Sequence, residues 1–450
     1  MKFDHSPTIE NVQRDAAETS REITRHVVRP KHHLRWAIVS IIILLTITNY
    51  LDRGNLSVAA PQIMQDLGIS HAMMGVILSA FVWPYAIMNL PTGWAVDRFG
   101  VKMLLALAAG LWSLVAVLTG FSRSVGTFIG LRVALGVSEA PLFPGALKAT
   151  DTWFPDREKA AATSAYIAAT QVGLALAPPL STLLMAAFGW PAMFIIMGLI
   201  GFVALVGWLV LYREPEKHPW LHKDELRYIR EGQATAQQAA DAPRVTVREW
   251  SKLFKHASVW YMVIGGFCLQ YVFWFYIGWL PTYLQQAQGF TLSHAGWLSA
   301  LPYIAGGVAV LVGGRFSDRL VSKGFNPFHA RRYTIAGAAL LTAGAMFVTA
   351  LINGPALAVV MLTLGMFTYS LSSGNYWTLA AEVVTTKKWV ASVGSIQNFG
   401  GFLGGAFAPV VTGIVVDHFG GFVPALMLAG FMALISAGMY GLALRHRLPV

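Results

Sequence analysis

The stretch Gly93–Arg98, which reads Gly-Trp-Ala-Val-Asp-Arg, recurs in the second half of the chain as Gly-Arg-Phe-Ser-Asp-Arg at Gly314–Arg319. Each copy follows a long apolar run. A second repeat begins with Ala-Pro and ends with Phe-Gly at the same spacing in Ala177–Gly189 and Ala408–Gly420. The sequence therefore contains two related halves, an organisation that in membrane proteins is typical of transporters with a site between the repeats.

The composition is that of a polytopic membrane protein. The chain has 450 residues, of which 55% are hydrophobic and 12% are charged, whereas soluble proteins carry about 25% charged residues. The single cysteine, Cys268, lies in an apolar run, so no disulfide within the chain can form. We expect it to be a small packing residue, and we expect no Cys/His metal site and no metal ligands.

The apolar runs are long enough to cross a bilayer as helices, because a helix needs about 20 residues to do so. Their length and continuity predict an all-α membrane protein with twelve transmembrane helices in two pseudo-symmetric six-helix bundles. The expected spans are 35–56, 74–96, 101–121, 125–147, 160–187, 191–212, 258–282, 294–316, 332–352, 355–380, 389–416 and 421–444.

Lys and Arg gather on one side of the predicted spans. The opposite side carries a single exposed cation, Arg123. The positive-inside rule then places both termini in the cytoplasm of a bacterial inner membrane. This distribution accounts for the net charge of +11 without nucleic-acid binding.

The spans and loops define five regions of the chain. We expect no signal peptide at the start, because the first residues are polar and contain no short apolar core. The predicted regions are a cytoplasmic tail at 1–34, an N-terminal bundle at 35–212, a cytoplasmic linker at 213–257, a C-terminal bundle at 258–444 and a cytoplasmic tail at 445–450.

Four charged residues lie in the interior of the predicted spans, more than one residue from either end: Asp52 and Arg53 in one, Arg132 and Glu139 in another. Such a charge at the bilayer centre costs at least about 2.5–3.5 kcal/mol. Arg132 and Glu139 are seven residues apart, so they share one helix face about 10 Å apart, whereas Asp52 and Arg53 point about 100° apart. The quartet indicates an ion or substrate pathway; the alternative is a neutral staple that pins two helices together.

The repeated Gly-x-x-x-Asp-Arg turn has a physical interpretation of its own. Glycine permits close helix approach, and Asp and Arg can pair across the cytoplasmic ends of neighbouring helices. We therefore expect a conformational latch there, the alternative being a charged turn that marks the membrane boundary. The latch residues are Gly93, Asp97, Arg98, Asp318 and Arg319.

Several of these stretches resemble a known family. Gly93–Lys102 resembles the cytoplasmic loop signature of the major facilitator superfamily, and Asn49–Val58 resembles the first helix of its anion:cation symporters. Leu131–Pro141, Trp153–Arg157 and Asn398–Gly401 extend the likeness to bacterial sugar-acid proton symporters of the D-galactonate type. The resemblance covers about 35–445 and implies the major facilitator fold.

The resemblance also implies roles for individual residues. Asp52 and Glu139 match acids that take up protons, and Arg132 matches the basic partner that tunes them. Arg53 matches the contact to the substrate carboxylate. The positions that match the lining of the sugar-acid pocket are Tyr50, Tyr85, Gln171, Trp377 and Asn398.

The chain departs from the family pattern in the C-terminal half. Asn375-Tyr376 stand where small hydroxyl residues are usual, and Glu382 is an additional acid. We include Asn375 among the candidate substrate contacts, because amides and indoles of this half suit hydroxyl recognition. For the aromatic residues, ordinary packing or an interfacial belt is the alternative.

The charges suggest how transport is driven. With both acids ionised the four formal charges cancel; one proton leaves the site at +1, and a monocarboxylate restores neutrality. Arginine suits this task because its fork grips a carboxylate through two hydrogen bonds. We therefore expect a monomeric, non-enzymatic, proton-coupled secondary transporter that imports an organic carboxylate by alternating access. The expected substrate is a sugar acid such as galactonate or a related hexonate or aldarate, and no cofactor is needed besides the coupling proton.

Other functions remain open from the sequence. Within transporters, the alternatives are a symporter of tartrate, a hexuronate or a phthalate-like aromatic acid, an organophosphate/anion antiporter and, less favoured, a drug/proton exporter. The predicted span 258–282 contains no Lys or Arg, which disfavours the antiporter, whose relatives place a basic residue in each half. A passive channel and a membrane enzyme or sensor are disfavoured by the loop signature and by the absence of a nucleophile–base pair in the sequence.

Overall fold

The computed structural model describes residues 33–233, 247–352 and 354–448, and it is α-helical. Helices suit this chain because each satisfies its own backbone hydrogen bonds, which lipid cannot do. Most of the predicted N-terminal tail, the middle of the predicted linker and residues 449–450 lie outside the described residues. The structure therefore bears on the two bundles and on the ends of the linker.

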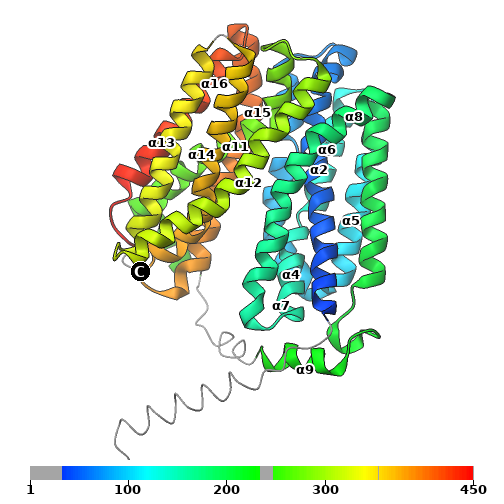
Figure 1. Cartoon of the computed structure of the whole chain (residues 1–450), viewed down its shortest axis with the longest axis vertical. Helices are drawn as coiled ribbons and strands as arrows, with labels where there is room; N and C mark the ends of the chain where they lie inside the picture. The colour runs from blue at the N-terminus through cyan, green and yellow to red at the C-terminus, as the bar shows by residue number, and fades with distance from the viewer. Residues whose placement is uncertain (1–32, 234–246, 353, 449–450) are drawn as a thin grey trace, which may run out of the picture.

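The N-terminal half is a bundle whose spans correspond to the first six predicted ones. Two of its passes consist of a pair of helices in sequence, α3 with α4 and α6 with α7 (Figure 1). The helices are α2 (Leu34–Leu67), α3 (His71–Ser79), α4 (Val82–Phe99), α5 (Val101–Thr119), α6 (Val125–Glu139), α7 (Leu142–Trp153) and α8 (Asp156–Leu211).

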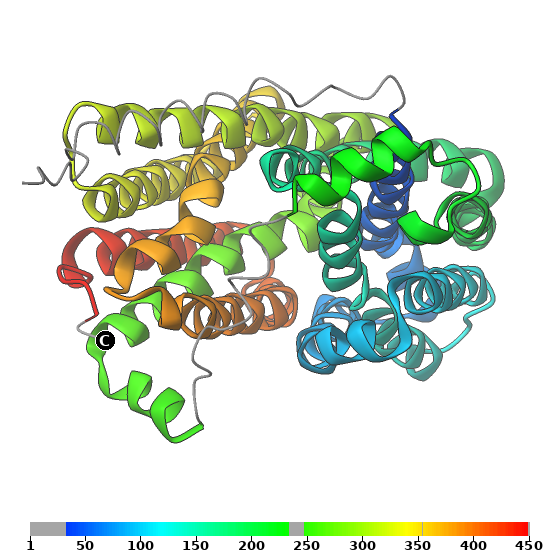
Figure 2. The same ribbon diagram turned by 90° about the horizontal axis from the view of Figure 1, so that it is seen from below.

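The C-terminal half follows two short helices of the linker. It is a second bundle beside the first, as the view from below shows (Figure 2). The linker helices are α9 (Lys223–Glu231) and α10 (Val247–Lys252); the bundle helices are α11 (Ala257–Gln286), α12 (Leu292–Ser322), α13 (Pro327–Leu351), α14 (Pro355–Val383), α15 (Val390–Phe419) and α16 (Val423–Gly438).

The described residues contain 11 helices that are long and apolar enough to cross a membrane, and one of them carries two passes. At 56 residues, α8 would extend about 84 Å if straight, far beyond the roughly 30 Å of a hydrocarbon core. It turns at Gly189, whose φ of 79° and ψ of 167° are not helical. Gly420 of the second repeat also has a positive φ, 73°, so both Phe-Gly pairs supply the left-handed residue that a turn needs. Twelve passes result.

The predicted C-terminal end of the first span was wrong. We expected it to end near residue 56, but α2 continues to Leu67 and ends at Gly68, which adopts a left-handed conformation. The extension contains Gln62, Gln65 and Asp66, whose polarity marks the end of an apolar run but does not interrupt a helix.

The two halves are joined at one end of the molecule. His71 at the start of α3 contacts Asp417 of α15, with Nδ1 and Oδ1 2.8 Å apart, and Gln286 of α11, with Nε2 and Oε1 2.8 Å apart. Thr282 of α11 donates to the Ser57 carbonyl of α2 at 3.4 Å. We call this the far end. The halves separate toward the opposite end, which carries α9 and which we call the linker end (Figure 1).

Helix α9 is held against the linker end of the N-terminal half (Figure 2). The Glu225 carboxylate accepts from the backbone N–H groups of Leu34 and Arg35 at 3.0 and 3.2 Å, and Arg35 Nη1 lies 2.8 Å from it. Arg35 Nε also donates to Glu158 at 2.9 Å, and Tyr228 donates to the same carboxylate. Burial raises the pKa of Tyr228, so its hydroxyl keeps the proton that it donates. Glu225 is fully buried at this contact.

The Glu225→Ala variant should be clearly less stable than the wild type. The substitution would remove an acid from the buried Arg35 and would leave the start of α2 without its cap. Removing one partner of a buried pair costs about 3 kcal/mol. Thermal unfolding of the purified protein should show the loss. Glu231→Ala, at an exposed position of the same helix, is the control; equal melting temperatures for both variants would contradict the prediction.

The Gly413→Ala variant should open the far end. A Cβ on Gly413 of α15 would lie 2.2 Å from the His71 carbonyl oxygen, so α3 and α15 must move apart. Spin labels on cysteines introduced at Met73 and Phe419, in a Cys268→Ala background, should report longer distances. Gly421→Ala is the control because a Cβ there meets nothing within 4 Å; an unchanged distance distribution in Gly413→Ala would count against the prediction.

Candidate functional site

A buried ion pair lies where α2 faces α6. Arg53 Nε donates to Glu139 Oε2 at 3.0 Å, and the two side chains are 5% and 0% exposed. The pair is only half satisfied, since Arg53 Nη2 and Glu139 Oε1 are buried without a hydrogen-bond partner among the described residues. A buried donor left unsatisfied costs about 1–3 kcal/mol, so this guanidinium edge has the capacity to bind a further acceptor.

Three aromatic rings enclose the Arg53 guanidinium. Its Cζ atom lies 4.4 Å from the ring centroid of Tyr50, 4.6 Å from that of Tyr85 and 5.1 Å from that of Phe81. Ring faces attract the cation at these distances. The cage restrains the guanidinium plane while its N–H edge stays available, which is the arrangement that bidentate carboxylate binding requires.

The second acid and the second base meet through an amide. Asn55 donates to Asp52 Oδ1 at 3.2 Å and accepts from Arg132 Nη2 at 3.5 Å. Arg132 Nη1 lies 3.5 Å from the Asp52 backbone carbonyl oxygen. The structure thus brings the four charged residues together in one buried cluster. The Arg132 side chain is connected to the Asp52 carboxylate through Asn55.

Asn55 and Phe81 were missed by the sequence reasoning. The signal for Asn55 was present, since an amide three residues after Asp52 in an apolar span shares its helix face. Phe81 carried no such signal, because it lies between α3 and α4 and joins the cage only through the tertiary fold.

Rings of the C-terminal half touch the cage. The ring centroid of Trp274 in α11 lies 6.1 Å from that of Phe81, and the ring centroid of Phe402 in α15 lies 5.4 Å from that of Tyr85. Gln171 of α8 also lies at the contact between halves, with its Cβ 3.7 Å from a Cβ built on Gly307 of α12. Its Oε1 is buried without a partner.

The remaining candidates of the C-terminal half are placed differently. Asn375 donates to the Gly313 carbonyl of α12 at 3.2 Å, so it ties two helices together. Trp377 is 56% exposed and its ring contacts that of its neighbour Tyr376. Asn398 is half-buried, with no recorded hydrogen bond in the described part of the chain. The structure brings none of these three side chains into recorded contact with the Arg53 cluster.

The acids of the predicted latch pair with bases other than the expected ones. Asp97 lies 3.1 Å from Lys148 Nζ of α7, and Asp318 lies 3.7 Å from Arg331 Nη2 of α13. Arg331 Nε lies 3.5 Å from the additional acid Glu382. Among the described residues Arg98 and Arg319 form no ion pair, and the partners Lys148 and Arg331 come from other helices of the same half. The role of the turn as a latch stays a prediction. Exposed pairs of this kind contribute about 0–1 kcal/mol each.

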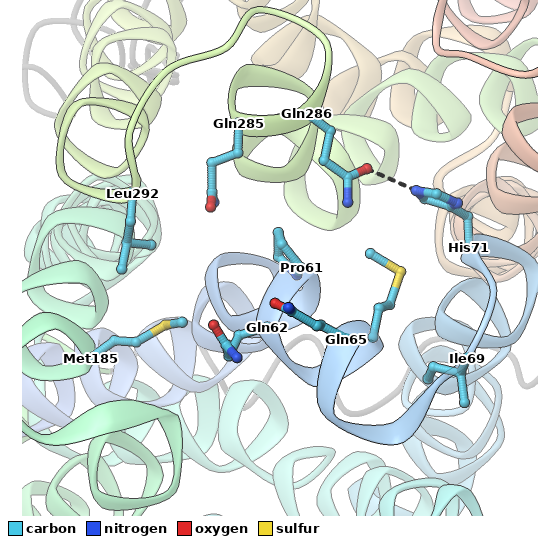
Figure 3. Close-up of a pocket in the computed structure, with 10 residues that line it drawn as sticks. Pro61, Gln62, Gln65, Ile69, His71, Met185, Gln285, Gln286 and Leu292 are labelled. Atoms are coloured by element: carbon cyan, nitrogen blue, oxygen red, sulfur yellow. Dashed lines mark hydrogen bonds between the residues drawn. The ribbon is translucent and has the colours of Figure 1, made fainter.

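A well-defined cavity lies away from this cluster. It lies at the far end between α2, α8, α11 and α12 and has a volume of ≈ 530 Å³ (Figure 3). Gln62, which lines it, is nine residues beyond Arg53 on α2, or about 13 Å along the helix axis. The charged cluster and this cavity are therefore separate sites.

Comparisons with known proteins identify the family of the chain. The family model of the Major Facilitator Superfamily matches residues 42–409. The chain is 32% identical to a probable L-galactonate transporter of Escherichia coli over 89% of this chain and 87% of that one. It is also 32% identical to a D-galactonate transporter of Escherichia coli, over 90% and 94% of the two chains, and to a probable galactarate/D-glucarate transporter of Bacillus subtilis, over 91% and 92%.

Solved structures share the fold at low identity. A bacterial homologue of the human lysosomal transporter Spinster, inward-facing and occupied, superposes with a TM-score of 0.75 at 16% identity, over 94% of this chain and 100% of that one. A D-xylose–proton symporter gives a TM-score of 0.71 at 15% identity, over 90% and 97%. With its twelve passes in two halves and this family match, the chain belongs to the Major Facilitator Superfamily of membrane transporters.

Proposed function

We propose that this transporter imports an organic carboxylate together with protons. A sugar acid such as galactonate, or a related hexonate or aldarate, is the proposed substrate. The observation that carries the proposal is the half-satisfied pair of Arg53 and Glu139, in which one guanidinium nitrogen has no partner. Transporters named for galactonate and for galactarate/D-glucarate at 32% identity support the substrate class.

The proton acts by releasing Arg53. While Glu139 is ionised it occupies the Nε of Arg53, and the cluster with its two acids and two bases is neutral. Protonation of Glu139 removes that competition and leaves the cluster at +1. A carboxylate can then bind the fork of Arg53 through two hydrogen bonds and restores neutrality. The conformational change costs less free energy when the cluster is neutral than when it is charged. The transporter therefore changes conformation only when the site is fully loaded or fully empty.

Asp52 can take up the second proton that a substrate with two carboxylates needs. A hexonate needs one proton to keep the cluster neutral, whereas an aldarate needs two. Asn55 and Arg132 hold Asp52 by long contacts, so its protonation breaks no direct ion pair. On this basis the two acids differ in role: Glu139 gates the binding of the anion, and Asp52 adjusts the charge.

The hydroxyl groups of the substrate need polar partners near Arg53. We assign this role to Tyr50, Tyr85 and Gln171 of the N-terminal half and to Asn398 of the C-terminal half. The unpartnered Oε1 of Gln171 supports its inclusion. Asn375 and Trp377 require a helix movement to take part, since one is bonded to α12 and the other is exposed.

The conformation fits the release step of import. Lys and Arg gather at the linker end, so the positive-inside rule assigns that end and both termini to the cytoplasm of a bacterial inner membrane. The halves are hydrogen-bonded at the far end, which closes the outer side. An organophosphate/anion antiporter is a weaker candidate, because α11 contributes no Lys or Arg to bind a second anionic charge.

Purified protein in proteoliposomes tests the coupling. Adding galactonate outside should acidify the interior of vesicles that contain the wild type, and a proton gradient should drive accumulation. Glu139→Gln, which imitates the protonated acid, should bind galactonate with little dependence on pH but should not accumulate it. Galactonate uptake without proton movement in the wild type would refute symport. Absence of galactonate uptake would refute the proposed substrate, and a panel of tartrate, hexuronate and phthalate would then identify it.

Arg53→Lys should bind the carboxylate about 10- to 100-fold more weakly. Lysine keeps the charge but loses the fork, and a hydrogen bond to a charged group contributes about 1.5–3 kcal/mol. Isothermal titration with galactonate measures the change. Arg227→Lys, at an exposed position of α9, is the matched control and should bind like the wild type. Equal affinities for all three proteins would remove Arg53 from the site.

A further inference from the structure

The cavity at the far end has the composition of a binding site. Its ≈ 530 Å³ lie within the range of about 300–1,000 Å³ that is usual for ligand pockets. Glutamine amides dominate the polar wall, and they alternate with apolar side chains (Figure 3). The lining residues are Pro61, Gln62, Met64, Gln65, Ile69, His71, Met185, Gln285, Gln286 and Leu292.

The amides retain free hydrogen-bonding capacity. Gln62 donates to Asp66 through its nitrogen at 2.8 Å, which leaves its oxygen available. Gln286 uses its oxygen toward His71, which leaves its nitrogen. An amide group carries both hydrogen-bond donors and an acceptor. These side chains can therefore bind hydroxyl groups, which also donate and accept hydrogen bonds.

The charged groups around the cavity already have hydrogen-bond partners within the protein. His71 faces Asp417 of α15, whose carboxylate also accepts from the His71 and Ala72 backbone N–H groups. Asp66 of α2 accepts from Gln62 and, at 2.7 Å, from the Trp190 indole of α8. The wall therefore selects for hydroxyl groups and not for net charge, unlike the cluster around Arg53.

Both halves of the transporter build the wall. Gln62 and Met185 come from α2 and α8, and Gln285 and Leu292 come from α11 and the start of α12. The cavity exists in this form only while the far end is closed. A ligand that fills it binds the closed state better than the open one and shifts the equilibrium toward closure.

We propose that this cavity is a second binding site, for an acyclic polyhydroxylated molecule, and that its occupation holds the far end closed. A hexitol carries the hydroxyl chain without a carboxylate and is the simplest ligand of this class. The site does not depend on which anion is transported; only its assignment to the outer face rests on the proposed function. Occupation slows uptake, because the far end must open to admit substrate.

Titration calorimetry with galactitol tests the site in the purified protein. The wild type should bind it saturably, and the double variant Gln62→Leu/Gln285→Leu should bind at least about tenfold more weakly, since it loses two amide partners. Gln288→Leu, a neighbouring glutamine outside the lining, is the control. Arg53→Lys should bind galactitol like the wild type, because its defect is confined to the carboxylate site.

Two further measurements separate this site from the transport site. Galactitol should shorten the Met73–Phe419 spin-label distances in the wild type but not in the double variant. In proteoliposomes that transport, external galactitol should lower the maximal uptake rate without raising the apparent KM. No binding, binding that survives the double substitution, or binding lost in Arg53→Lys would each overturn the proposal. Galactitol binding without any galactonate transport would refute the proposed function alone.

Discussion

The ion pair between Arg53 and Glu139 is the constraint on which the site depends. Two opposite charges in a membrane-spanning bundle are costly to bury, and well-packed apolar residues would stabilise the helices as well or better. The aromatic cage restrains Arg53, yet one of its nitrogens and one Glu139 oxygen have no partner. A static staple would satisfy these atoms. In the proposed mechanism a proton breaks this pair and the substrate anion then binds Arg53, so these two atoms must stay available.

The cage also links the charge to the conformation. Its rings come from the N-terminal half, but Phe81 touches Trp274 and Tyr85 touches Phe402, both of the C-terminal half. A change at Arg53 therefore reaches the contact between the halves directly. The far end is closed here by His71, Asp417 and Gln286. In the proposed cycle it has an open and a closed state, and a change at Arg53 shifts the equilibrium between them. Arg53 lies on α2 and His71 begins α3, the next helix, so the charged site and the closed end are also near one another along the chain.

Much of the fold follows from long, continuous apolar runs and the repeated Asp-Arg and Phe-Gly signals, because lipid allows few other solutions. The four charges were equally predictable, since charge in an apolar span is conspicuous. Contacts made by polar groups were not. Asn55 between Asp52 and Arg132, Glu225 at the start of α2 and Lys148 beside Asp97 depend on which helices become neighbours. Asn375 bonds a carbonyl of α12 through its amide nitrogen, and its role at the substrate stays a prediction, because an amide serves either purpose and sequence does not distinguish them.

Difference infrared spectroscopy tests the release of Arg53 most directly. Adding galactonate to the purified wild type should produce a new carbonyl stretch of a protonated carboxyl group, because the anion binds as Glu139 takes up its proton. The band should be absent in Glu139→Gln and retained in Glu231→Gln. Carboxylate binding with no such band, or with the same band in Glu139→Gln, would contradict the account.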